Sequence, residues 1–145
     1  MGHKWLRLGD RFILDDADYR VIETVSAHTD RTTVQALCVM PELGGEARWL
    51  LQVEDEDPLE AERAEAQGWE DAEVTVGGER LRREWSAPAR TEHTLPDRTT
   101  RFGRGECAMY RSAGGVVGVR ISDQAQAQAF VGRPLPPERI DLRFT

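Results

Sequence analysis

The stretch EDEDPLEAERAEAQGWEDAE, residues 54–73, decides the interpretation of the chain, because it separates two segments with one sequence pattern. On both sides of it, short apolar runs alternate with turn residues, which is typical of β-strands. The stretch itself offers Asp57 as a helix N-cap and Pro58 as a first helical residue. Ala, Glu and Arg follow, and Gly68 is a common helix end. We therefore expect one short surface helix at residues 58–67.

The segment before the acidic stretch predicts four strands. Tyr19, Val21, Val25 and Ala27 are expected to share one face of a strand. Residues 33–40 are apolar at both parities, which is typical of a strand that is covered on both faces. Turn residues separate these runs, so the segment predicts an antiparallel meander.

The segment after the acidic stretch predicts five more strands. Two hairpin turns are expected, at Gly77-Gly78 and at residues 112–115. Pro88 is expected to end or edge a strand, and the polar residues 91–105 form the longest expected loop. Residues 125–131 fit either a strand or a short helix. The whole pattern favours a mainly β protein whose antiparallel meanders form a barrel or a two-layer sandwich of about nine strands.

The chain is expected to form a single β-rich domain over residues 1–145. Its parts are a first meander at 5–54, an acidic helical bridge at 55–70 and a second β half at 71–145. Cys38 and Cys107, and likewise Glu23 and Glu92, recur at one constant spacing. This weak similarity predicts that the two halves are pseudo-repeats.

Charge and targeting signals exclude some classes of function. The chain has 145 residues and a net charge of −7, and ten acids against one base give residues 54–73 a charge of −9. The remainder is close to neutral, so we expect no nucleic-acid partner. No secretory signal or apolar span long enough for a membrane is visible, so we expect a cytoplasmic protein without membrane insertion.

No residues in the sequence form a recognisable catalytic or metal-binding motif. His3, His28 and His93 are too far apart in the sequence for a zinc motif. Cys38 and Cys107 lie in apolar runs, which predicts buried, free and unreactive thiols. We therefore expect no catalytic residue, no cofactor and no bound metal.

Two groups of charged residues are candidates for binding. An acidic group could attract another protein or a cationic small molecule, and an arginine group in the expected loop could bind an anion. The acidic group consists of Glu54, Asp55, Glu56, Asp57 and Glu60. The arginine group consists of Arg98, Arg101 and Arg104. The sequence does not indicate an oligomeric state.

Several short motifs resemble one bacterial family. They are Gly9-Asp10-x-Phe12, Tyr19-Arg20-Val21-Ile22, and Glu46 to Leu50 followed by Val53-Glu54-Asp55, with Gly68 and Ala72-Glu73-Val74 after them. This pattern, over about residues 6–76, resembles the bacterial family called domain of unknown function 4178. The resemblance implies a β-rich domain without an assigned activity, and an accessory role beside membrane-stress or polyamine-related genes.

These observations favour a non-enzymatic binding or adaptor module. One alternative is a small-ligand-binding β-barrel, because closed sheets readily enclose a ligand. Another is an enzyme with an unrecognised carboxylate site, for which Glu23 and Glu92 are the candidates.

Overall fold

A computed structural model describes residues 5–69 and 71–142 of the chain, and these residues form one antiparallel sheet of eleven strands. The first meander contains β1 (Arg11–Leu14), β2 (Ala17–His28), β3 (Thr33–Pro41), β4 (Arg48–Val53) and β5 (Leu59–Ala64). The second contains β6 (Glu73–Val76), β7 (Glu79–Thr94), β8 (Thr100–Arg111), β9 (Val117–Asp123) and β10 (Ala127–Pro134). The 3-10 turn η1 (Pro137–Arg139) and β11 (Ile140–Asp141) follow. The expected mainly β, antiparallel fold is confirmed, with eleven strands instead of nine.

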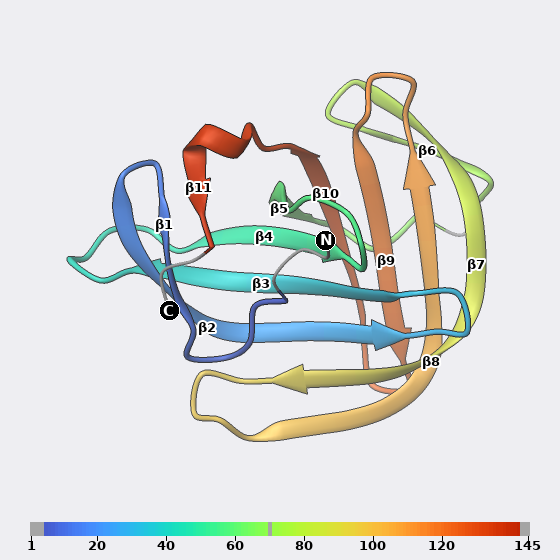
Figure 1. The fold of residues 1–145 in the computed structure, drawn as a ribbon. Coiled ribbons are helices and arrows are strands. Elements are labelled where there is room, and N and C mark those ends of the chain that lie inside the picture. Colours follow the sequence, from blue (N-terminus) through green and yellow to red (C-terminus); the bar gives the residue numbers. More distant parts are fainter. Residues whose placement is uncertain (1–4, 70, 143–145) are drawn as a thin grey trace.

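Eight of the strands close into a ring. The first meander joins the second twice, because β2 pairs with β7 and β5 pairs with β10 (Figure 1). The hydrogen bonds therefore run around β2–β5 and β7–β10, which makes the fold close to a barrel. Both halves are five-stranded meanders, although their sequence repeat remains a prediction.

The helix expected at residues 58–67 is wrong. These residues form β5 and the start of the connection to β6, and the described residues contain no α-helix, hence none that could cross a membrane. Leu59 and Ala61 alternate with acids, so β5 has the period of a strand although its residues favour helices. Because β5 fills the place between β4 and β10, its pairing overrides local propensity.

The main core fills the inside of the ring. Its buried residues come from all eight ring strands, which only an inward-facing set can do. Val25, Val34, Leu51, Phe130 and Met109 are among them, each at most 2% exposed. Buried apolar area of this kind supplies most of the stability of a domain.

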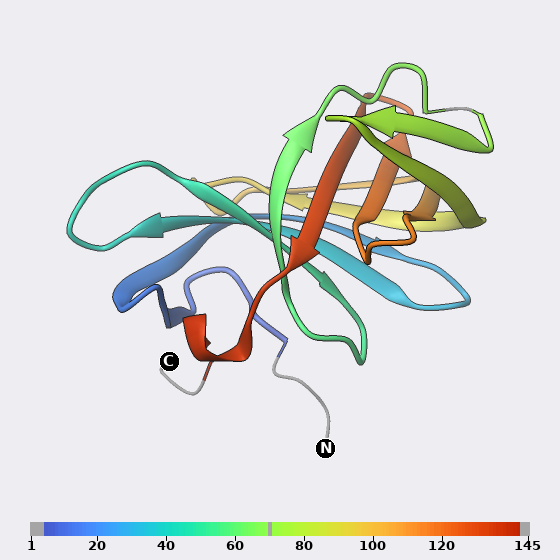
Figure 2. The same ribbon diagram turned by 90° about the horizontal axis from the view of Figure 1, so that it is seen from above.

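A second apolar cluster covers the outer face of the first meander. Leu6, Phe12 and Leu14 pack there against Leu37 and Leu50 of β3 and β4. The backbone of Leu6 is bound by the buried side chains of two glutamines, Gln35 and Gln52. η1 and β11 lie beside β1 on this outer side (Figure 2).

A third cluster covers the outer face of the second meander. Trp69, in the connection between β5 and β6, is 3% exposed and packs on Leu81, Ala108 and Tyr110. The Tyr110 hydroxyl donates a hydrogen bond to the Trp69 carbonyl. The connection is therefore held by packing, whereas the expected surface helix would have had little to anchor it.

Two strand details differ from expectation. Tyr19 and Val21 face the outer cluster, whereas Val25 and Ala27 face the ring interior, because a β-bulge between Val21 and Glu23 shifts the register. The loop expected at residues 91–105 is mostly strand. There β7 and β8 pair as far as Thr94 and Thr100 and leave a short turn.

Pro88 does not end β7. It pairs with Glu106 of β8, in the stretch of β7 that lies between its pairings with β6 and β2. In that stretch the edge of β7 that faces away from β8 has no neighbouring strand among the described residues, so a missing N–H donor on that edge costs no ladder hydrogen bond.

Candidate functional site

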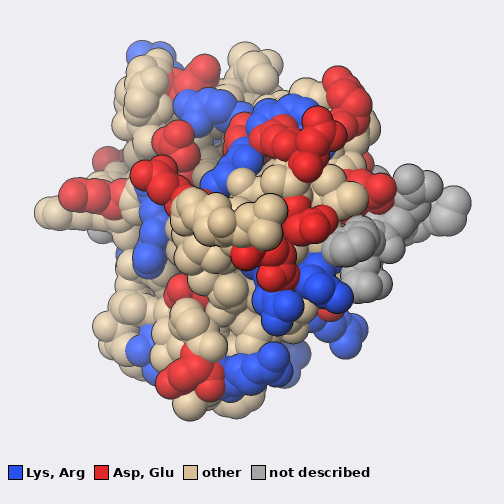
Figure 3. All heavy atoms as spheres, turned by 90° about the vertical axis from the view of Figure 1, so that its left-hand side faces the viewer, with Lys and Arg blue, Asp and Glu red and all other residues tan. Residues whose placement is uncertain are grey.

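The acidic residues singled out in the sequence are partly engaged within the molecule. Glu60 accepts hydrogen bonds from Arg48 and Arg139, and both arginines also bind Asp15. These arginines hold the pKa of Asp15 and of Glu60 below their usual values. Glu56 forms an ion pair with Arg111 at 3.0 Å. On the side that carries the β3–β4 hairpin, acids and bases are interleaved (Figure 3).

At one end of the ring the inward-facing positions are polar. We call this group the polar mouth. The strand register identifies its members. Two residues that are directly opposite each other on neighbouring strands point to the same face of the sheet, so a residue opposite an inward-facing one also faces inward. They are Glu23, Arg63, His93, Arg101, Asp123 and Gln128.

Glu23 and His93 form the most buried contact between ionisable side chains in the polar mouth. The Glu23 Oε2 atom lies 2.6 Å from the His93 Nε2 atom, and the side chains are 18% and 13% exposed. The Gln126 Nε2 atom lies 3.2 Å from His93 Nδ1. A neutral imidazole with its proton on Nε2 satisfies both contacts, because Nε2–H then donates to Glu23 and Nδ1 accepts from Gln126.

Arg63 lies over aromatic rings in the polar mouth. Its guanidinium carbon is 5.2 Å from the centre of the Trp49 ring and 5.9 Å from that of Phe130. It also donates a hydrogen bond to the Gln128 side chain. Such stacking holds a charged group beside apolar surface at little cost.

Neither cysteine is arranged as a nucleophile. Both thiols are buried and free, as expected. Burial raises the pKa of Cys107 to about 12, and burial together with the Glu23 carboxylate raises the pKa of Cys38. The thiols therefore remain protonated at neutral pH.

Glu23 and Glu92 do not form a carboxylate pair. Glu23 points into the ring toward His93. Glu92 precedes His93 on β7 and so faces outward, where its Oε1 atom lies 3.7 Å from His28 Nε2. Among the described residues, no three His, Cys, Asp or Glu side chains are placed to hold a metal ion.

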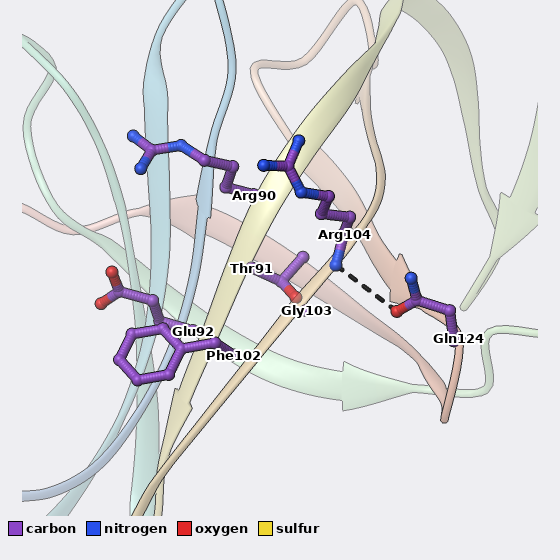
Figure 4. Close-up of a pocket in the computed structure, with 7 residues that line it drawn as sticks. All are labelled: Arg90, Thr91, Glu92, Phe102, Gly103, Arg104 and Gln124. Atoms are coloured by element: carbon purple, nitrogen blue, oxygen red, sulfur yellow. Dashed lines mark hydrogen bonds between the residues drawn. The ribbon is translucent and has the colours of Figure 1, made fainter.

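A second candidate site lies on the outer face of β7 and β8. Arg90 and Arg104 are directly opposite each other on these strands, and two residues further along the same face Glu92 is opposite Phe102. The two arginines extend toward the same side in Figure 4. They line a hollow of about 440 Å³ together with Phe102 and Gln124. Within residues 5–69 and 71–142, neither arginine side chain forms an ion pair or hydrogen bond.

A further hollow of about 440 Å³ adjoins the first. It is also lined by Arg90 and Arg104, with His28 and Asp30 from the β2 end. His28 is directly opposite Arg90 on β2, so His28, Arg90 and Arg104 make one row across three strands. Arg90 and Arg104 therefore lie between two hollows, and we call these two residues the arginine pair.

The structure separates the three arginines that the sequence grouped. Arg104 belongs to the arginine pair, whereas Arg101 is opposite His93. Against the effect of burial, backbone hydrogen bonds from Ala125 and Gln126 lower the pKa of Asp123, and the charge of Arg101 adds to them. Arg98 lies in the β7–β8 turn. Sequence reasoning missed Arg90 and Phe102. The available signal was Phe102-x-Arg104, where an apolar residue and an arginine share a strand face in a polar stretch.

Comparison with known proteins adds nothing to this geometry. No family model, no curated protein and no solved structure matches the chain. The resemblance to the domain of unknown function 4178 family stays a hypothesis that rests on its short motifs.

Proposed function

We propose that the protein is a non-enzymatic binding module, an adaptor that recognises an anionic group through Arg90 and Arg104. The observation that carries the proposal is the pairing of these two arginines across strands, beside a hollow and without an acidic partner in the described part of the chain.

Electrostatics support this proposal. Like charges directly opposite each other on neighbouring strands destabilise a sheet. A bound carboxylate or phosphate would remove the repulsion, and a guanidinium can bind either group through two parallel N–H donors. A hydrogen bond to a charged group contributes about 1.5–3 kcal/mol. Removal of one arginine should therefore weaken binding by about ten- to hundredfold.

Calorimetric titration with inorganic phosphate at constant ionic strength tests the proposal. The wild-type protein is expected to bind saturably, and Arg90→Gln with Arg104→Gln should abolish binding. The matched control is Arg80→Gln with Arg82→Gln, which removes two exposed arginines from one face of the same strand outside the hollow. The control should bind as the wild type does.

Two results would contradict the proposal. One is the absence of saturable binding to the wild-type protein. The other is an equal loss of binding in the control variant, because that would assign the effect to net charge alone.

A second candidate function is the binding of a small ligand at the polar mouth. The observation that favours it is that charged groups replace apolar residues at one end of an otherwise apolar ring interior. A thermal-shift screen of small molecules would support it if a hit lost its effect in Glu23→Gln and in Arg63→Gln. It fails if every hit is unchanged in both variants.

A further inference from the structure

We infer that the anion held by the arginine pair is the phosphate of a monoester that carries a flat aromatic group. This inference rests on the proposed function and names the ligand class of the same site. The additional observation is Phe102, which lines the hollow and is 72% exposed. Single exposed apolar residues are common on protein surfaces, so the position of Phe102 beside the arginine pair supports the inference, and its exposure alone does not.

The position of Phe102 relative to the arginines sets the ligand's shape. Phe102 and Arg104 are two residues apart on β8 and therefore share a face. At about 3.3–3.4 Å per residue, their backbone positions are about 7 Å apart. The row of Glu92 and Phe102 follows the row of Arg90 and Arg104 directly (Figure 4). A phosphate between the guanidiniums would thus place its ester group beside the Phe102 ring.

Charge balance favours phosphate over carboxylate. A phosphomonoester carries about −1.5 to −2 charges near neutral pH and has three acceptor oxygens. It can neutralise both arginines at once, whereas one carboxylate neutralises only one. The neighbouring carboxylate of Glu92 opposes a dianion, so the stacking of a ring on Phe102 would add the affinity that charge alone does not.

Calorimetric titration of the full chain at pH 8 with four probes tests the inference. The probes are inorganic phosphate, phenyl phosphate, adenosine 5′-monophosphate and benzoate. Stacking of a ring on an aromatic side chain strengthens binding by roughly five- to hundredfold. We expect at least one of the two aromatic phosphates to bind about fivefold or more tightly than inorganic phosphate, and benzoate to bind more weakly than both. If phenyl phosphate binds more tightly than adenosine 5′-monophosphate, the preferred ligand carries its ring next to the phosphate. If adenosine 5′-monophosphate binds more tightly, the preferred ring is one sugar away.

Phe102→Ala should lower the affinity for the aromatic phosphates to that for inorganic phosphate, which itself should not change. The matched control is Leu43→Ala, which removes another exposed apolar side chain, on the β3–β4 turn. The inference is overturned if Phe102→Ala binds the aromatic phosphates as tightly as the wild type does, or if benzoate equals phenyl phosphate. If this inference is overturned but inorganic phosphate still binds through the arginine pair, the proposed function stands. If none of the four probes binds, the inference and the proposed function both fail.

Discussion

Trp69→Ala should remove a large part of the stability of the second meander. Trp69 is 3% exposed, meets Tyr110 edge-on with ring centres 5.2 Å apart, and packs on the outer face of β8–β10. Truncation of a buried tryptophan to alanine costs about 3–5 kcal/mol, because apolar contacts are lost and a cavity remains. Since the free energy of unfolding of a domain is about 5–15 kcal/mol, the variant should be severely destabilised.

Urea denaturation followed by circular dichroism measures this loss. Trp69→Phe should cost less than Trp69→Ala, because a ring still fills most of the space. Tyr110→Phe removes only the hydroxyl that binds the Trp69 carbonyl and should cost about 0.5–1.5 kcal/mol. If Trp69→Ala changes the free energy of unfolding by less than about 0.5 kcal/mol, as is usual for surface positions, the packed connection between β5 and β6 is refuted.

Three further predictions concern charge. The folded-state pKa of Asp15 is depressed by Arg139 and Arg48, so its contribution to stability is fully present above the unfolded pKa of about 3.9 and is lost as the pH falls from there through the lower folded-state pKa. Asp15→Asn should therefore lower the free energy of unfolding at pH 7, by about 0.2–1 kcal/mol because this carboxylate is 38% exposed, and the difference from wild type should shrink steadily as the pH falls below about 4; a constant difference would contradict this. In a double-mutant cycle of Arg90→Gln and Arg104→Gln, urea denaturation should show a repulsive coupling of about 0.2–1 kcal/mol that disappears in 1 M salt, and a coupling that persists there would not be electrostatic. Glu92→Gln should bind inorganic phosphate a few-fold more tightly in calorimetry, because a carboxylate that faces the hollow is removed, and unchanged or weaker binding would argue against a phosphate beside it.

Local patterns in the sequence predicted much of the sheet. Alternating apolar residues and turn residues correctly indicated the first four strands and the hairpin at Gly77-Gly78. The strand at residues 33–40 is covered on both faces as predicted, because one of its faces belongs to the core inside the ring and the other to the outer cluster of the first meander. β5 could not be assigned in this way, because its residues favour a helix and only the neighbouring strands β4 and β10 decide otherwise. Likewise, the bulge after Val21 changes which face is apolar without any signal from Gly or Pro.

The candidate site was harder to predict, because its members come from strands that are distant in the sequence. Glu23 and His93 meet only because β2 and β7 close the ring. Arg90 and Arg104 face each other through the register of the β7–β8 hairpin. Arg104 lies in the stretch 91–105, whose polarity indicated a loop, and Arg90 directly precedes that stretch. Residues there are polar because one face is solvent-exposed and the other lines the polar mouth, so the usual alternation is missing.

The central claim is that Arg90 and Arg104 together bind an anion. The most direct test follows the side-chain Nε–H resonances of both arginines by NMR during a titration with inorganic phosphate at constant ionic strength, with the assignments taken from the single Gln variants. The account predicts that both resonances shift together and saturate at one affinity. If both stay in place while other resonances move, the anion binds elsewhere and the claim is wrong.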